Sequence, residues 1–138
     1  MFILETSADF DSAHFLAGYE GKCSNIHGHR WHITAQISGD VQDNGQERGM
    51  VMDFGTFKAD LRAIADSLDH VLIYESGSLR EKTLEALREE NFRLYEVPFR
   101  PTAENLALYI YELLCEKAYS PVSVRVYETP TNSAEYRP

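Results

Sequence analysis

The 138-residue sequence contains few cysteines and no long apolar segment. Its two cysteines, Cys23 and Cys115, are too few for the disulfide framework of a small secreted domain, and this favours a reduced compartment. The first five residues lack the basic start and apolar core of a signal peptide, and no later segment is long enough to cross a bilayer. We therefore expect a cytoplasmic protein without a membrane partner.

Positive charge is also scarce. Thirteen Lys and Arg residues face 22 Asp and Glu residues, which gives a net charge of −9. Proteins that bind nucleic acids or membrane surfaces depend on positive fields, so the composition argues against both partners. A phosphate ligand would have to meet a local group of cations. Lys22, Arg30, Arg48 and Arg100 are possible sources, but their spacing singles out none of them.

No internal repeat, low-complexity tract or flexible linker interrupts the sequence. We therefore expect one domain over residues 1–138. Apolar residues alternate with polar ones over residues 2–12 and again over residues 31–38, which is typical of half-buried strands. A third strand is predicted around residues 122–126, followed by a turn at 129–132 and a short last strand near Glu135 and Tyr136.

Three helices are predicted between the two pairs of strands. The first is capped by Asp53, ends near Asp69 and carries one apolar stripe: Phe54, Phe57, Leu61, Ile64 and Leu68. The second, over residues 78–91, is polar and has a solvated face. Pro101 opens the third, with Thr102 as its cap and Cys115 as a buried thiol. This order predicts an α+β domain with an antiparallel sheet, helices on one face, and edges that subunit association can cover.

The segment from Cys23 to His29 is the densest chemical signal. Residues two apart in an extended chain point the same way, so His27 and His29 can bind one ion, and His14 at the end of the first strand offers a third imidazole. Three neutral imidazoles suit zinc and leave a fourth position for water or substrate. An isolated histidine such as His32 is more often packed or solvated than a ligand.

Cys23 has two interpretations that the sequence leaves open. If its sulfur completes a tetrahedron with the three histidines, the site is closed and the protein is a zinc-stabilised binding module without catalysis. If the sulfur stays off the metal, Cys23 is a candidate base, because a nearby dication and Lys22 favour the thiolate.

Two further candidates carry carboxylates. Asp69 and His70 follow the predicted end of the first long helix, and a carboxylate that accepts from an imidazole can make a proton relay. Glu128 continues the inward face of the strand that contains Val124 and Val126. Such a carboxylate matches the adjacent N–H donors of a pterin or guanine edge.

These motifs together resemble the 6-pyruvoyl-tetrahydropterin synthase superfamily. The resemblance runs from about residue 8 to residue 129 and is carried by six motifs in order: Ala13-His14, Cys23 to His29, Met52-Asp53-Phe54, Leu68-Asp69-His70, Pro101 to Leu106, and Glu128-Thr129. It implies the tunnelling fold, in which strands from several subunits close into a barrel, and a homohexamer built from two trimers with active sites between subunits.

The resemblance also implies the roles of particular residues. It assigns zinc to His14, His27 and His29, acid–base catalysis to Cys23, and a second proton-transfer unit to Asp69 and His70. The substrate, a pterin triphosphate, would be anchored by Glu128 with help from Thr102. Glu104 is a weaker candidate, since its place in the first turn of a helix already gives it a capping role.

The three residues between Cys23 and His27 resemble the bacterial 6-carboxy-tetrahydropterin synthase branch of queuosine biosynthesis. That branch converts 7,8-dihydroneopterin triphosphate to 6-carboxy-5,6,7,8-tetrahydropterin, and releases acetaldehyde and triphosphate. The alternatives are a pyruvoyl-forming lyase that keeps the two-carbon fragment, a folate-pathway enzyme that cleaves the side chain, and a noncatalytic zinc-stabilised pterin binder. Residues 75–97 form an insert that is long and charged for the carboxy-forming branch.

Overall fold

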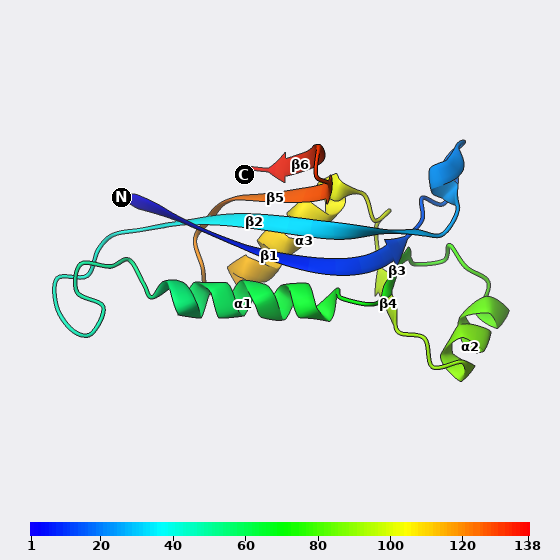
Figure 1. Cartoon of the computed structure of the whole chain (residues 1–138), viewed down its shortest axis with the longest axis horizontal. Helices are drawn as coiled ribbons and strands as arrows, with labels where there is room; N and C mark the ends of the chain where they lie inside the picture. The colour runs from blue at the N-terminus through cyan, green and yellow to red at the C-terminus, as the bar shows by residue number, and fades with distance from the viewer.

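The computed structural model describes all 138 residues as one curved sheet with two long helices on one face (Figure 1). The strands are β1 (Phe2–His14), β2 (His27–Gly39), β3 (Leu72–Glu75), β4 (Leu94–Val97), β5 (Pro121–Thr129) and β6 (Asn132–Tyr136). The helices are α1 (Phe54–Ser67), α2 (Glu81–Glu89) and α3 (Ala103–Glu116), and a short 3-10 turn, η1 (Lys22–Ser24), lies between β1 and β2. None of the helices has the length and apolar character needed to cross a membrane.

The six strands follow the order β4-β3-β1-β2-β5-β6. As predicted, β1, β2, β5 and β6 are antiparallel. The expectation of a purely antiparallel sheet is wrong at one edge, where β3 runs parallel to β1 and β4 runs parallel to β3. Both strands lie in or beside the charged insert and are four residues long, too short to show a period in the sequence.

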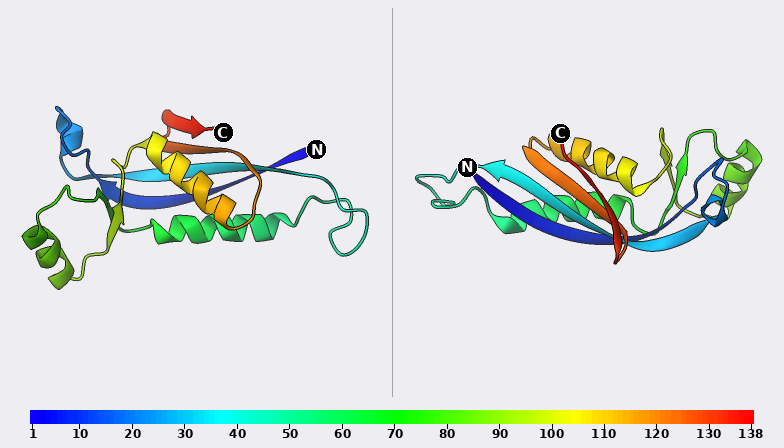
Figure 2. Two further views of the ribbon diagram at one scale, coloured as in Figure 1. Left: turned by 180° about the vertical axis from the view of Figure 1, so that it is seen from behind. Right: turned by 90° about the horizontal axis from the view of Figure 1, so that it is seen from above.

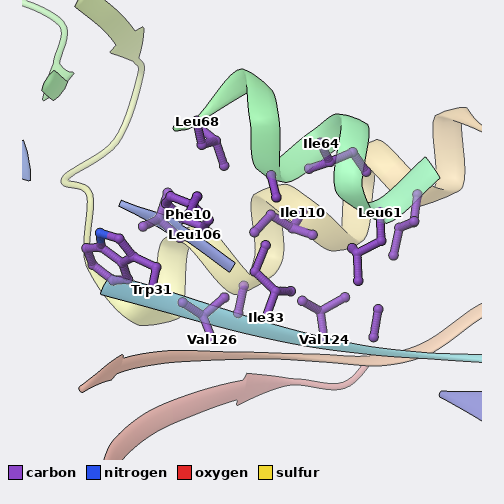
Figure 3. Packing of buried hydrophobic residues seen from close by; sticks show 14 of the residues in the cluster. Phe10, Trp31, Ile33, Leu61, Ile64, Leu68, Leu106, Ile110, Val124 and Val126 are labelled. Atoms are coloured by element: carbon purple, nitrogen blue, oxygen red, sulfur yellow. The ribbon is translucent and has the colours of Figure 1, made fainter. Parts of the chain in front are cut away.

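Helices α1 and α3 cover the same face of the sheet, as Figure 2 shows from two further directions. Figure 3 shows Leu61, Ile64 and Leu68 of α1 and Leu106 and Ile110 of α3 packed against residues of β1, β2 and β5. The sheet supplies Phe10, Trp31, Ile33, Val124 and Val126 to the same core. Trp31 is fully buried and stacks on Phe10 with 5.9 Å between the ring centroids. The core therefore lies next to the end of the β1–β2 hairpin.

The predicted helix starts at Asp53 and Thr102 are confirmed. Asp53 Oδ1 accepts hydrogen bonds from the backbone of Gly55 and Thr56 at 2.6 and 3.3 Å. Thr102 Oγ1 accepts from the backbone of Asn105 at 3.2 Å. Because Thr102 is the cap, α3 begins at Ala103 rather than at Pro101.

Two expectations about burial are wrong. Phe54 is 64% exposed, because the apolar stripe of α1 meets the sheet only from Phe57 onwards, and the pattern does not say where along a helix that contact begins. Cys115 is also exposed, because its neighbour Leu114 occupies the core side of α3. The polar helix in the insert is shorter than predicted, and only its Leu84 is buried, in a small second cluster with Phe15 and Tyr74.

Phe57 and Phe54 allow a matched test of this packing. Phe57→Ala should lower the free energy of unfolding by about 3–5 kcal/mol, because it empties a fully buried site. Phe54→Ala, one turn earlier on the same helix, should change it by less than about 0.5 kcal/mol. Urea denaturation at constant protein concentration measures both. A comparable loss for both variants would show that Phe54 is buried, for instance against another subunit.

Candidate metal centre and its surroundings

Three histidines meet at the end of the β1–β2 hairpin where η1 lies (Figure 1). His14 is the last residue of β1 and pairs in register with His27, the first residue of β2. His29 lies two residues further along β2 on the same face, as the alternation of an extended strand requires. One potential ligand nitrogen from each residue lies within 4.8 Å of the other two. The predicted ligands are thus brought together.

Backbone carbonyl groups orient two of the three rings. His14 Nδ1 lies 2.8 Å from the carbonyl oxygen of Pro101, and His27 Nδ1 lies 2.7 Å from that of Asn25. A carbonyl can only accept, so each Nδ1 carries the proton and each Nε2 keeps its lone pair. His14 Nε2 is buried and has no hydrogen-bond partner. A buried nitrogen that accepts from nothing is costly, and a metal ion would satisfy it.

His29 is constrained differently. Its Nε2 is also buried without a hydrogen bond, although Glu128 Oε1 lies 3.4 Å away. The two observations are consistent, because the atoms are within ion-pair range while their angles do not fit a hydrogen bond. His29 Nε2 therefore has no hydrogen-bond partner in the chain, could bind a metal, and has a carboxylate beside it.

Burial lowers the pKa of two of the three histidines. Desolvation lowers the pKa of His14, and the hydrogen bond to Pro101 opposes this only in part. Desolvation likewise lowers the pKa of His29 against the opposing effect of Glu128. A lowered pKa keeps the imidazole neutral near pH 7, which is the form that binds a metal. The residues present therefore fit a three-nitrogen metal site.

Cys23 does not belong to the cluster of potential ligand atoms, which comprises the three histidines alone. It is a half-buried free thiol in η1. A set of three nitrogens leaves a coordination position open, which is the arrangement of catalytic rather than structural zinc sites. The geometry therefore favours the second interpretation of Cys23, with its sulfur off the metal.

Asp69 and His70 form the expected pair. His70 Nδ1 lies 2.8 Å from Asp69 Oδ2, while Asp69 Oδ1 accepts from the backbone of Asp11 at 2.8 Å. The hydrogen bond from Asp11, followed by that from His70, lowers the pKa of Asp69. His70 adopts a left-handed backbone conformation with φ of 53°, and its N–H donates to Asp11 O. The dyad is thus fixed to the edge of β1.

The dyad and the histidine cluster share a cavity through His29. His70 and His29 line a cavity of about 710 Å³ together with Asp11, Arg30 and Phe92. Asp11 alternates with Ser12, and Arg30 with His29, and all four line the cavity, so it reaches both faces at this end of the hairpin. No hydrogen bond or ring contact joins the dyad to the cluster within one chain. His70 and His29 therefore share a cavity without direct contact.

Glu128 lines a second cavity, of about 560 Å³, with His29, Tyr127 and Thr129. It lies on the same face of β5 as Val124 and Val126, as predicted, and is half-buried. Thr102 and Glu104 do not line this cavity: Thr102 caps α3, and Glu104 is exposed in its first turn. The structure accordingly places Glu128 beside the histidines and leaves the other two in helix-terminal positions.

Several site groups had no signal in the sequence. The carbonyl oxygens of Pro101 and Asn25 orient two rings, and the backbone of Asp11 holds the dyad. Backbone groups are the same in every residue, so no composition or spacing identifies them. His32 was interpreted as an ordinary histidine, yet its Nδ1 lies 2.6 Å from Asp9 Oδ1, and both residues line the cavity that contains Glu128.

The lowered pKa values predict how the metal-free protein responds to acid. Both His14 and His29 have folded pKa values below the ordinary value of about 6.5, so the unfolded chain binds more protons below that pH. The free energy of unfolding should therefore fall as the pH drops from 7.5 to 5.5. In His14→Gln the fall should be smaller but still present, because His29 remains. Urea denaturation of chelator-treated protein tests this; an unchanged pH dependence in the variant would contradict it.

Comparison with known proteins agrees with the site. The sequence model of the 6-pyruvoyl tetrahydropterin synthase family matches residues 3–138. The chain is 39% identical to the 6-carboxy-5,6,7,8-tetrahydropterin synthase of Haemophilus influenzae over 140 aligned residues, which cover 99% of each protein. It is 32% identical to the enzyme of the same name from Synechocystis, with 99% of this chain and 93% of the relative covered.

The fold agrees as well. The crystal structure of 6-pyruvoyl tetrahydropterin synthase from Plasmodium vivax superposes with a TM-score of 0.69 at 21% identity, over 100% of this chain and 99% of the other. The mixed curved sheet with its helices on one face is therefore the tunnelling fold of those enzymes. A family match over nearly the whole length, together with the histidine cluster, leads to one conclusion: this chain belongs to the 6-pyruvoyl tetrahydropterin synthase family of enzymes.

Proposed function

We propose that the protein is a zinc-dependent lyase that converts 7,8-dihydroneopterin triphosphate to 6-carboxy-5,6,7,8-tetrahydropterin, with release of acetaldehyde and triphosphate. The observation that carries the proposal is the cluster of His14, His27 and His29, with two buried nitrogens that have no partner in the chain. The identity of 39% to a relative named for this product favours the carboxy-forming reaction over the pyruvoyl-forming one. The product would serve queuosine biosynthesis, and the two free thiols suit the cytoplasm.

Zinc suits the three neutral imidazoles better than a hard cation does, because oxygen ligands dominate magnesium and calcium sites. When bound, it would supply a Lewis acid that acidifies the side-chain hydroxyl groups of the substrate. His14 and His27 would hold it with rings that are already oriented by Pro101 and Asn25. Little reorganisation is then needed on metal binding.

Glu128 would anchor the pterin. Its carboxylate lines a cavity beside His29 and can accept from the adjacent N–H groups of the amino-pyrimidinone edge. This would place the side chain of the substrate toward the histidine cluster. Thr102 and Glu104 remain weaker candidates for substrate contacts, because both already serve the start of α3.

Two proton carriers complete the proposal. Cys23, on the turn that precedes His27, would move a proton on one side of the substrate. His70 would move the other, with Asp69 holding its Nδ1–H and thereby leaving Nε2 to exchange protons. The lowered pKa of Asp69 keeps the carboxylate ionised, so it can stabilise a protonated His70.

The edges of the sheet and the position of the dyad support an oligomeric enzyme. Because the dyad makes no hydrogen bond to the histidine cluster of its own chain, we infer that the dyad of one subunit completes the site of another. The sheet ends in unpaired edges at β4 and β6, which neighbouring subunits can cover. A homohexamer of two trimers with sites between subunits satisfies both requirements.

The deciding experiment is a product analysis with 7,8-dihydroneopterin triphosphate. The zinc-loaded protein should release acetaldehyde and triphosphate in equal amounts and form the carboxy-pterin, as measured by mass spectrometry. Chelation should abolish turnover, and added zinc should restore it. Release of triphosphate with retention of the two-carbon fragment would instead identify a pyruvoyl-forming lyase. Substrate binding without turnover would identify a noncatalytic binder.

Cys23→Ala tests the acid–base role of the thiol. The variant should keep its zinc and lose at least about 100-fold in kcat, as expected for loss of an acid–base group.

Complementation tests the sites between subunits. Variants His70→Gln and His29→Gln should each be nearly inactive alone, because one lacks the proton carrier and the other a metal ligand. When they are denatured and refolded together, hybrid assemblies should contain some sites with both intact groups, and activity should return to a measurable fraction of the wild type. Two His29→Gln samples refolded together provide the background. Failure of hybrids, confirmed by tagged co-purification, to show activity would place both groups in the site of one chain.

A further inference from the structure

Arg100 is a half-buried arginine two residues before the cap of α3. Its Nη2 donates a hydrogen bond to the carbonyl oxygen of Ala17 at 2.6 Å, and no carboxylate pairs with it. Its own carbonyl oxygen accepts from Asn105 Nδ2 at 2.9 Å and from the backbone N–H of Thr102 at 2.8 Å. The residue is therefore fixed at its backbone by α3 and extends its charged end to another part of the chain.

Ala17 belongs to the Cys23 connection, by which we mean residues 15–26 between β1 and β2. This connection is closed on itself, because the backbone N–H of Leu16 donates to Cys23 O at 2.9 Å. Its remaining hydrogen bonds also stay within the hairpin, for example Asn25 O with His27 Nδ1. Phe15 and Ala17, at its start, pack on the small cluster that contains Tyr74 and Leu84. The bond from Arg100 is the only hydrogen bond that ties the connection to an element outside the hairpin, and it adds a directional restraint to this packing.

The same short segment also holds the histidine cluster. Pro101, the next residue, is buried and orients His14 through its carbonyl oxygen. Arg100 and Pro101 therefore contact the two halves of the site from neighbouring positions: one holds the turn that carries Cys23, and the other holds a metal-binding histidine. A long planar cation suits this task, because a guanidinium is always charged and makes strong hydrogen bonds to oxygen.

We propose that Arg100 is a positioning residue that fixes the Cys23 connection relative to the histidine cluster. It acts through Ala17 and does not touch the substrate. This inference rests on the proposed function only in giving Cys23 a proton to move. Because a proton carrier displaced by about 1 Å can lose up to about 100-fold in rate, the loss of this tie should appear in kcat. The pterin anchor, Glu128, lies on β5, so KM should hardly change.

The experiment uses Arg100→Met and Arg100→Lys in a Cys115→Ser background, so that Cys23 is the only thiol. Arg100→Met keeps the aliphatic stem but removes the donor, while lysine keeps the charge with a different reach. With zinc bound and no substrate, alkylation of Cys23 by iodoacetamide should be at least about threefold faster in Arg100→Met, because a released connection opens more often. Zinc content should remain that of the parent protein.

In the same variant, kcat should fall about 10- to 100-fold with KM within about twofold of the parent, and Arg100→Lys should recover part of kcat. Arg62→Met, an exposed position on α1, makes the same change of charge and side chain away from the site and should alter neither readout. Unchanged alkylation would overturn the inference, and so would a rise in KM with normal kcat, which would make Arg100 a phosphate ligand. Alkylation needs no substrate. It therefore tests the positioning role of Arg100 even if the wild-type protein fails to form the carboxy-pterin.

Discussion

The register of the β1–β2 hairpin is the constraint on which the rest of the structure depends. Pairing of His14 with His27 brings two imidazoles together at the hairpin end, and the alternation of β2 adds His29 on the same face. A slip of one residue between the strands would turn one set of rings to the other face of the sheet. The register is held by burial, because Phe10 pairs with Trp31 four residues from the hairpin end and both lie in the core. The same strand register therefore sets both the core packing and the meeting of the three histidines.

The end of the β1–β2 hairpin carries chemical groups on both faces. On the helix side lie the histidine cluster and Glu128, supported by the core through Trp31, whose ring is in edge contact with His14 at 4.9 Å. Asp11 and Arg30, on the other face of the strands, line a cavity together with His70 and His29. Within one chain the dyad and the cluster share this cavity but make no hydrogen bond to each other. In our proposal, oligomerisation joins the dyad of one subunit to the cluster of another, which links catalysis to assembly.

The start of α3 is the second support of the site. Thr102 ends the connecting segment by capping the helix, and Pro101 and Arg100, which precede it, face His14 and the Cys23 connection. A helix buried through Leu106 and Ile110 is a rigid base for these contacts. The position of the proposed acid–base residue therefore depends on packing far from Cys23 in the sequence.

The sequence by itself determined the histidines of the candidate metal site, the long antiparallel strands and the helix caps. Each follows from local spacing: His-x-His on an extended chain, alternation over residues 31–38, and Asp53 or Thr102 before an apolar stripe. Tertiary structure decided what local spacing does not contain. Three features depend on which distant segment lies alongside: the parallel pairing of β3 and β4, the exposure of Phe54 and Cys115, and the orientation of His14 by the carbonyl group of Pro101. The cavity shared by His70 and His29 is of the same kind, because sequence motifs identify the candidate groups of a site while the path of the chain decides which of them lie together.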